Sequence, residues 1–253
     1  MRYFLKLSYN GTRFHGWQSQ PNAVSVQQNI EEALSIVTRL PINIVGAGRT
    51  DAGVHAREMF AHFDVPFAVA DKSRFLNSIN RLVGKDVAFD DLIEVSDEAH
   101  ARFDAIERTY KYFITYNKSP FVYDYSCFMP HELDVDAMNE AAKILLTTSD
   151  FTSFAKLHSD AKTNLCEVRE AHWNKSGEDF PFIPNGLVFT ISANRFLRNM
   201  VRAVVGTLVE VGRGRVTSDG FRDIILSKNR SSAGMSMPAE GLFLWEIKYP
   251  YIK

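Results

Sequence analysis

The chain has 253 residues, of which 45% are hydrophobic and 23% are charged. This composition is typical of globular proteins and excludes a disordered chain. No apolar run approaches the roughly 18 residues needed to cross a membrane, and the start, MRYFLKLSYNGT, lacks the apolar segment of a signal peptide. The formal net charge of -1 argues by itself against a nucleic-acid-binding protein.

The first half of the chain predicts alternating strands and helices. Residues 3–9 have the alternating pattern of a strand. Residues 25–40 have the apolar spacing of a helix, with Ser25 as a candidate cap. Further strands are expected at 42–45, 59–65 and 86–95, and a short helix near 72–81.

The second half has a similar content and no detectable sequence repeat. We expect strands at 108–116, 166–173, 186–193 and 242–249, and helices at 135–146, 195–212 and 221–228. Together the two halves predict a mixed α/β fold.

Charge is unevenly distributed along the chain. Residues 86–104 contain seven acidic residues and one basic residue, for a net charge of -6. Residues 195–230 contain eight basic and three acidic residues, for a net charge of +5. Such asymmetry is typical of a basic cleft on a nearly neutral protein, but two solvated surfaces of opposite sign would give the same pattern.

The predicted helix at 195–212 sharpens the question of the basic segment. On an ideal helix, Arg195, Arg198 and Arg202 lie on one face, opposite a mainly apolar face. We interpret this stripe as a phosphate-binding surface, with a solvated helix face as the alternative. Gly206 costs about 1 kcal/mol relative to alanine inside a helix, which indicates close approach of another backbone or of RNA.

The segment GAGRTDAGVHA (46–56) places three glycines around Arg49 and Asp51. It is not a dinucleotide fingerprint, because Asp51 stands where the third glycine belongs. A phosphate-binding loop is also excluded, since no Gly-Lys-Ser/Thr follows. Two interpretations remain at this point: an ordinary turn with an Arg49–Asp51 surface pair, or a catalytic carboxylate on a loop that a substrate can approach closely.

Five segments of the chain, in this order, resemble the motifs of the tRNA pseudouridine synthase A family. They are SYNGTRFHGWQSQPNAVSVQQNIEEAL (8–34), GAGRTDAGVHA (46–56), HARFDAIERTYKYFI (100–114), FLRNMVRAVVGTLVEVGRG (196–214) and PAEGLFLWEIKYP (238–250). The resemblance therefore covers nearly the whole chain. Two departures concern details of tRNA contact: GMSM (234–237) replaces small residues and a threonine, and 145–154 lacks a Gly-x-His.

This resemblance implies an activity, a fold and a set of partners. The activity is isomerisation of uridine to pseudouridine in the anticodon stem-loop of tRNA, at tRNA positions 38, 39 and 40, with no metal or organic cofactor. The fold is two similar α/β subdomains, here 1–105 and 106–253, sharing one continuous mixed, mainly antiparallel sheet with a central active-site cleft. The family is a homodimer, with the tRNA lying across both subunits.

The resemblance also implies roles for individual residues. Asp51 matches the catalytic aspartate, and Arg202 matches the arginine that pairs with it. Tyr110 matches a tyrosine that packs on the target base, and Leu242 matches an apolar residue of the base pocket. Arg49 matches an arginine that helps to flip the base. Attack of the aspartate at C6, attack at C1′ and a glycal route all require an ionised carboxylate, and the sequence leaves the three open.

Two other functions stay open beside the synthase. One is a catalytically silent RNA-binding module, which the presence of Asp51 and Tyr110 disfavours. The other is a carboxylate-dependent hydrolase, which needs a second carboxylate near the first, and Glu58 is the nearest candidate. In the first loop, Phe14 and Trp17 are either core residues or RNA contacts.

The two cysteines, Cys127 and Cys166, form no metal or redox motif. Their pattern favours a reducing compartment, and we expect a cytoplasmic location without membrane attachment. The seven histidines lack the spacing of a common metal site.

Overall fold

A computed structural model describes residues 1–156, 162–177 and 180–252. Contacts divide the chain into two compact units. The first comprises Met1–Ile106 and Leu244–Lys253, and the second comprises Glu107–Phe243. This division assigns 244–253 to the first unit, whereas the sequence-based boundary at 105/106 assigns it to the second. In the described ranges, no helix has both the length and the apolar character needed to cross a membrane.

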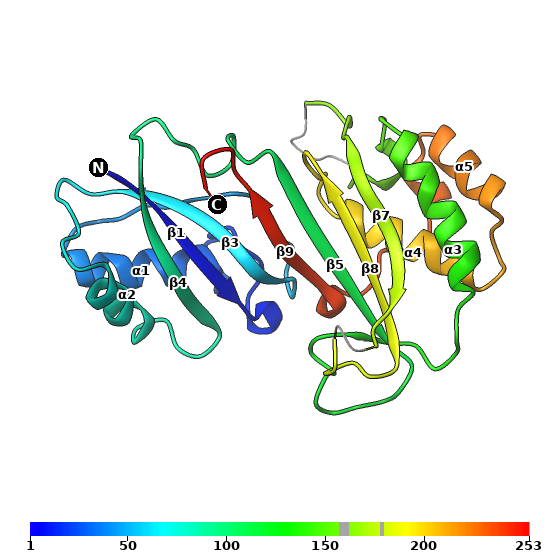
Figure 1. The fold of residues 1–253 in the computed structure, drawn as a ribbon, viewed down its shortest axis with the longest axis horizontal. Coiled ribbons are helices and arrows are strands. Elements are labelled where there is room, and N and C mark those ends of the chain that lie inside the picture. The colour runs from blue at the N-terminus through cyan, green and yellow to red at the C-terminus, as the bar shows by residue number, and fades with distance from the viewer. Residues whose placement is uncertain (157–161, 178–179, 253) are drawn as a thin grey trace. The chain divides into compact units, whose positions relative to one another are not determined.

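The first unit places two helices on one face of an antiparallel group of strands (Figure 1). Its elements are β1 (Arg2–Tyr9), α1 (Val26–Thr38), β2 (Val45–Gly46), β3 (His55–Asp64), α2 (Lys72–Asn80) and β4 (Val87–Val95). Strand β1 lies between β3 and β4 and runs antiparallel to both. Aromatic rings connect the sheet to α2, because Phe63 stacks on Tyr3 and on Phe75.

Helices α1 and α2 begin where the sequence provides a cap. The hydroxyl of Ser25 accepts the N–H of Gln28 at 3.2 Å, and the carboxylate of Asp71 accepts the N–H of Arg74 at 2.8 Å. Such caps satisfy backbone donors that have no partner inside the helix. Helix α1 ends at Arg39, which adopts a left-handed conformation with φ of 58°. The helices predicted at 25–40 and 72–81 are therefore confirmed.

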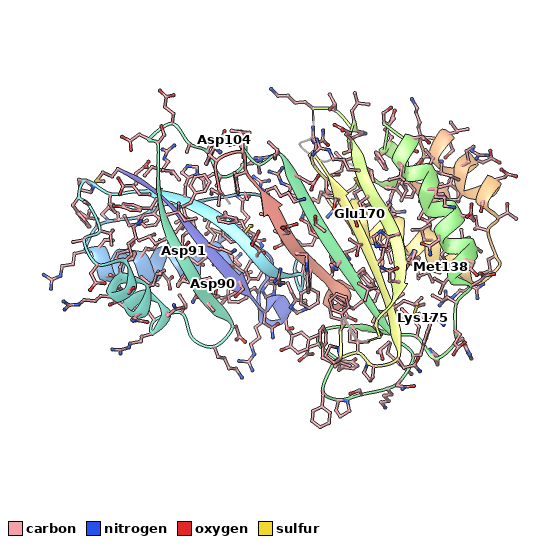
Figure 2. All side chains as sticks on the ribbon, in the orientation of Figure 1. Asp90, Asp91, Asp104, Met138, Glu170 and Lys175 are labelled. Carbon is pink, nitrogen blue, oxygen red and sulfur yellow. The ribbon has the colours of Figure 1, made fainter. Side chains whose placement is uncertain are left out.

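The acidic segment 86–104 forms an edge strand and the loop that follows it. Asp90 and Asp91 are exposed on β4 (Figure 2), and the register with β1 shifts around Asp90. Charged side chains and such a bulge discourage pairing of an edge strand with another chain. Asp86 forms an ion pair with Arg13 at 3.6 Å. These contacts give the negative segment a structural role within the first unit.

The second unit is built in the same way from a later stretch of the chain. Its elements are β5 (Glu107–Thr115), β6 (Cys127–Phe128), α3 (Val135–Lys143), β7 (Val168–Lys175), β8 (Gly186–Ala193), α4 (Met200–Gly212) and α5 (Ser218–Leu226). Strand β8 lies between β5 and β7 and is antiparallel to both, whereas β6 is parallel to β5. Helix α3 contacts α4, α5 and β7.

The last strand, β9 (Leu242–Lys248), is where the chain passes from the second unit back into the first. In the part of the chain that the structure describes, nine strands form one sheet in the order β4-β1-β3-β9-β5-β8-β7, with β2 beside β3 and β6 beside β5. The predicted α/β class with one continuous, mainly antiparallel mixed sheet is confirmed. The predicted cleft remains an expectation.

The strand predicted at 42–45 is wrong for most of its length, because only Val45–Gly46 joins the sheet as β2. The backbone N–H groups before it have other partners. The N–H of Ile42 donates to Ser35 Oγ at 3.1 Å, and that of Ile44 donates to Glu31 Oε1 at 3.0 Å. Side chains of α1 thus satisfy the donors that a neighbouring strand would have satisfied.

The helix predicted at 195–212 begins five residues later, at Met200. Asn199 has a left-handed backbone with φ of 65°, which a helix interior does not accommodate. Arg195 and Arg198 therefore precede the helix, and the proposed arginine stripe on one helix face is wrong. Helix α4 is also buried on nearly every side, with Arg202 and Glu210 as its two half-buried residues, so α4 itself presents no solvated face.

Gly206 owes its position in α4 to a neighbouring segment of protein. A Cβ atom on Gly206 would lie 1.8 Å from the carbonyl oxygen of Met235, far inside van der Waals contact. The backbone of residues 234–237, here called the anchor segment, therefore passes directly over this turn of the helix. Of the two explanations offered for Gly206, close approach of another backbone is confirmed.

Candidate active site

Asp51 lies in the aspartate loop (residues 47–54), which connects β2 to β3 in the first unit. Asp51 is half-buried and Arg49, on the same loop, is exposed. The N–H of Val54 donates to the carbonyl oxygen of Asp51 at 3.2 Å, and Gly53 adopts φ of 79°. A tight turn that needs a glycine thus follows directly after the aspartate.

A second loop, here called the first loop (residues 10–17), holds the aspartate loop in place. The N–H of Trp17 donates to the carbonyl oxygen of Thr50 at 3.2 Å, and the N–H of Gly53 donates to that of Phe14 at 3.3 Å. Phe14 and Trp17 are 7% and 3% exposed. Both are therefore core residues, and the alternative that they contact RNA is not supported.

Glycines allow the two loops to approach each other. A Cβ atom on Gly11 would lie 2.0 Å from the carbonyl oxygen of Val54, and one on Gly16 would lie 2.5 Å from that of Thr50. Within the segment GAGRTDAGVHA (46–56), a Cβ atom on Gly46 would lie 2.5 Å from the Trp17 indole. A Cβ atom on Gly48 would have no heavy atom within 4 Å. Gly48 thus has open space beside it.

Two further residues complete the support of the aspartate loop. The hydroxyl groups of Tyr9 and Thr50 are 2.9 Å apart, and both residues are buried. His55, which is 1% exposed, accepts the N–H of Gly11 on Nδ1 at 3.1 Å. Sequence reasoning did not single out Tyr9, Thr50 or His55 individually. The available signal was the opening motif YNGTRFHGW (9–17). The residues of this motif that contact the aspartate loop are Tyr9, Gly11, Phe14, Gly16 and Trp17.

Tyr110 lies on β5 in the second unit, opposite Ile191 of β8. Its half-buried ring meets the ring of Phe196 edge-on, with centroids 5.1 Å apart. Phe196 belongs to the loop before α4, which also contains half-buried Arg195 and exposed Arg198. The structure therefore brings the Tyr110 ring close to the loop that contains both arginines.

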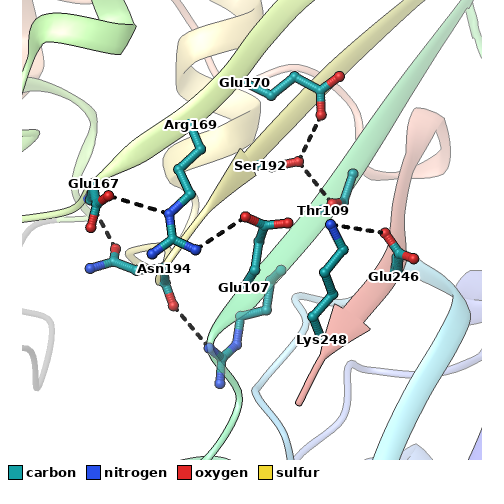
Figure 3. Close-up of polar contacts among 10 residues, drawn as sticks. Glu107, Thr109, Glu167, Arg169, Glu170, Ser192, Asn194, Glu246 and Lys248 are labelled. Atoms are coloured by element: carbon teal, nitrogen blue, oxygen red, sulfur yellow. Dashed lines mark hydrogen bonds and ion pairs between the residues drawn. The ribbon is translucent and has the colours of Figure 1, made fainter. Parts of the chain in front are cut away.

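Polar contacts connect strands β5, β8 and β7 (Figure 3). The hydroxyl groups of Thr109 on β5 and Ser192 on β8 are 2.8 Å apart, and Ser192 donates to Glu170 on β7 at 3.0 Å. The guanidinium of Arg169 on β7 donates to Glu107 on β5 at 3.1 Å. Side chains thus connect β5, β8 and β7 near the N-terminal end of β5, which is the part of the strand that contains Tyr110.

Arg202 lies near the beginning of α4 and is anchored to the anchor segment. Its Nε donates to the carbonyl oxygen of Met237 at 2.6 Å, and its own carbonyl oxygen accepts the Met237 N–H at 3.1 Å. The other end of the segment is held by two contacts of Gly234. Its N–H donates to Thr207 at 2.9 Å, and its carbonyl oxygen accepts from Arg230 at 3.1 Å.

Leu242 is the first residue of β9 and is 5% exposed. The chain before it passes over Tyr112, whose hydroxyl donates to the carbonyl oxygen of Pro238 at 2.9 Å. Burial raises the pKa of Tyr112 well above its usual range, so this hydroxyl stays protonated and donates. Tyr110 and Tyr112 lie on the same face of β5. The bond from Tyr112 to Pro238 therefore connects that face of β5 to the chain that leads into Leu242.

Much of the positive charge of 195–230 is offset by ion pairs. Arg213 and Arg215 both pair with Glu210. Arg222 pairs with Asp219, and Lys228 pairs with Asp150 at 2.9 Å. Glu210 and Asp219 are already counted in the net charge of +5, so of these pairs only Lys228–Asp150 brings in an acid from outside the segment. Among the residues that the structure describes, no group of three His, Cys, Asp or Glu side chains is arranged to hold a metal ion.

The sequence was compared with those of known proteins. Residues 141–250 match the family described as tRNA pseudouridine synthase. A tRNA pseudouridine synthase A from Parabacteroides distasonis is 54% identical over 249 residues, which cover 98% of this chain and 96% of the relative. The enzyme of that name from Porphyromonas gingivalis is 51% identical over 98% of this chain and 97% of the relative. The one from Bacillus pumilus is 36% identical over 96% and 97%.

Proposed function

The chain belongs to the tRNA pseudouridine synthase A family, and we propose that it converts uridine to pseudouridine in the anticodon stem-loop of tRNA with Asp51 as its catalytic carboxylate. The tRNA positions implied are 38, 39 and 40. The observation that carries this proposal is the support of the aspartate loop, in which Thr50 and Gly53 are bonded to the first loop on both sides of Asp51. A carboxylate that reacts with carbon must be held in a fixed position.

The reaction requires an ionised carboxylate and a mobile base. The bond between N1 of uracil and C1′ of ribose breaks, the base rotates, and C5 joins C1′ while the C5 proton leaves and N1 gains a proton. Asp51 serves as a nucleophile at C6 or C1′, or as a base that removes a ribose proton. An arginine stays charged at any working pH and can bind a carboxylate through two hydrogen bonds. We therefore assign this pairing role to Arg202.

The other residues bind the substrate. A base contributes about 1–3 kcal/mol when it stacks on an aromatic ring, and we assign this role to Tyr110, whose ring is held edge-on by Phe196. Leu242 supplies an apolar wall of the base pocket, and Arg49 helps to flip the base. Arg195 and Arg198 contact phosphates, and the exposure of Arg198 supports this.

We further infer a homodimer with the tRNA lying across both subunits, as the family resemblance implies, and a cytoplasmic location, where tRNA substrates occur. Both cysteines are buried free thiols, and burial raises the pKa of Cys166 to about 11. Such thiols are unreactive and suit a reducing compartment. Sedimentation of the protein alone and with tRNA tests the dimer.

A hydrolase is disfavoured by the contacts of Glu58, the nearest second carboxylate in the sequence. Glu58 Oε2 forms an ion pair with Lys6 at 2.7 Å, and Oε1 accepts the N–H of Ile247 at 2.9 Å. Both oxygens are thus engaged in holding β1, β3 and β9 together. A general acid or base must instead be able to reach the substrate.

Release of tritium from C5 of uracil tests the reaction class. A tRNA transcript labelled at this carbon should release label into water when mixed with the protein alone, because C5 becomes the new glycosidic carbon. Replacing uridines 38 to 40 should abolish the release. Free labelled uracil would identify a hydrolase, and label retained on fully bound tRNA would identify a silent binding module.

A further inference from the structure

Thr50, the residue directly before Asp51, is fixed through both its side chain and its backbone. It is 9% exposed. Its hydroxyl is 2.9 Å from the hydroxyl of Tyr9, at the end of β1, and its carbonyl oxygen accepts the N–H of Trp17 at 3.2 Å. The peptide group that leads into Asp51 therefore has two fixed points on its N-terminal side.

Stability alone does not account for a hydroxyl pair at this position. Replacing both partners of a buried hydrogen bond by apolar groups of similar shape is often nearly neutral for stability, whereas removing one partner leaves the other unsatisfied. A phenylalanine and a valine would fill nearly the same volume as Tyr9 and Thr50. What the apolar pair would lack is direction, because a hydrogen bond selects one rotamer of Thr50 where packing alone permits more.

The contacts on the other side of Asp51 make this direction important. The N–H of Gly53 is bonded to the carbonyl oxygen of Phe14, and the turn itself is closed between Asp51 and Val54. Because both flanks are held, we expect a backbone shift of Thr50 that follows loss of its side-chain hydrogen bond to be transmitted to Asp51. A misplacement of 1 Å at a reacting group can cost on the order of a hundredfold in rate.

We propose that Tyr9 is a positioning residue for pseudouridine formation. Its hydroxyl orients Thr50, and Thr50 in turn orients the catalytic carboxylate of Asp51. This proposal rests on the proposed function, and it assigns Tyr9 no contact with the RNA. The role of the opening motif follows from it: β1 and the first loop act on the chemistry through the backbone of the aspartate loop.

The main test compares two tyrosines of the same strand. Tyr9→Phe removes the hydroxyl that bonds Thr50, whereas the control Tyr3→Phe removes a hydroxyl that accepts the N–H of Val69 at 2.9 Å. Both side chains are buried. We expect Tyr9→Phe to lower kcat for tritium release by about tenfold, as loss of one directing hydrogen bond would. Its tRNA Kd should remain that of the wild type, and Tyr3→Phe should keep wild-type kcat.

A double-mutant cycle with Thr50 separates positioning from a general loss of packing. Thr50→Val should lower kcat as Tyr9→Phe does, and the variant with both substitutions should be no worse than either single variant, because they remove the same hydrogen bond. Thr50→Ser retains the hydroxyl and should recover most of the wild-type kcat.

The outcomes distinguish this proposal from the proposed function. No tritium release by the wild-type protein overturns the proposed function, and the positioning role falls with it. An active wild type together with wild-type kcat in Tyr9→Phe overturns the positioning role alone. Equal losses in Tyr9→Phe and Tyr3→Phe, or additive effects in the cycle, also overturn it, because they indicate a structural role only.

Discussion

The loop that contains Asp51 and the helix start that contains Arg202 are fixed in different ways. The aspartate loop is held by the neighbours of Asp51, since Thr50 and Gly53 bond to the first loop. Arg202 is held by its own side chain, because its Nε donates to the carbonyl oxygen of Met237. In both regions a glycine, Gly16 or Gly206, allows a second backbone to come close.

This difference follows from the chemistry of the two side chains. A carboxylate only accepts hydrogen bonds, and a donor or positive charge beside it keeps it ionised. A guanidinium has five donors and can use one for anchoring while it keeps its full charge. A reacting aspartate can thus be positioned through the backbone of its loop, and its charged partner can be positioned through the side chain.

The largest effect is expected for the reacting group itself. Asp51→Asn has nearly the same shape but cannot act as a nucleophile or base, so we expect tritium release to fall below detection. The tRNA Kd should stay within a few-fold of the wild type, because the loop is held by other residues. Filter binding and tritium release on the same preparation measure both quantities. Measurable turnover by this variant would show that Asp51 is not the catalytic carboxylate.

Substitution of Arg202 tests whether the side-chain anchor matters. Arg202→Ala removes the charge and the anchor, and we expect kcat to fall on the order of a hundredfold, as for loss of one preorganised donor. Arg202→Lys keeps the charge but lacks the planar fork that could bond Met237 and, in the proposed role, a carboxylate at the same time, so it should recover little activity. Arg222→Lys, in a surface pair with Asp219, is the matched control. Full activity in Arg202→Lys would show that Arg202 contributes only its positive charge and not the geometry of its guanidinium.

Alanine substitutions at three glycines compare the two backbone contacts directly. Gly16→Ala and Gly206→Ala each place a Cβ atom against a carbonyl oxygen, and overpacking of this kind costs about 1–3 kcal/mol. At Gly16 the φ of 91° adds strain. Gly48→Ala meets no atom within 4 Å and should change stability by less than about 0.5 kcal/mol.

Urea unfolding measures all three variants. Tritium release by Gly48→Ala adds a second result, because a stable but inactive variant would indicate that the substrate approaches the loop at this glycine. Unchanged stability in Gly206→Ala would contradict the close approach of the anchor segment.

A smaller effect is expected at the loop before α4. Arg195→Ala and Arg198→Ala should weaken tRNA binding by a few-fold each, and each lost phosphate contact should reduce the slope of log K against log salt by somewhat under one unit. Tyr110 is nearby, but kcat at saturating tRNA should change little. Titrations at several salt concentrations, with Arg222→Ala as control, measure this. An unchanged slope in the double variant would assign both arginines to an ordinary surface.

The last comparison concerns acid stability of the first unit. Burial, with smaller contributions from Arg2 and His100, lowers the pKa of His62 to about 4, and His62 Nδ1 accepts the N–H of Ala101 at 3.1 Å. The unfolded chain, with an ordinary histidine pKa near 6.5, binds the proton first as the pH falls. Stability should therefore decrease from about pH 6.5 to about pH 4.

The variant His62→Gln removes this titration and should show a flatter decrease of the urea midpoint over the same pH interval, although it starts from a lower stability. The same dependence in wild type and variant would assign the acid sensitivity to other groups. His172 is half-buried on β7 in the second unit, and His172→Gln serves as the control for loss of a histidine elsewhere in the chain.

The sequence by itself determined the class of the fold and the elements whose pattern is local. Apolar spacing and a capping residue were enough to predict α1 and α2, because a helix end depends on residues within one turn. Alternation was enough to predict β1, and strand-like segments were enough to predict β4, β5 and β8. The separated motifs were enough to indicate the family, and they singled out Asp51 among the many acidic residues of the chain.

Only the tertiary structure decided features that depend on a partner far away in the sequence. Helix α4 begins at Met200 because Asn199 takes a left-handed conformation beside Ser236, which no helical pattern within 195–212 reveals. Most of the segment 42–45 forms no strand, because side chains of α1 accept the backbone hydrogen bonds of Ile42 and Ile44. Likewise, Gly206 and Gly16 are explained by carbonyl groups about 30 or more residues away. Local sequence patterns carry no information on such contacts, because the contacts depend on which distant segment of backbone packs against the residue in the folded chain.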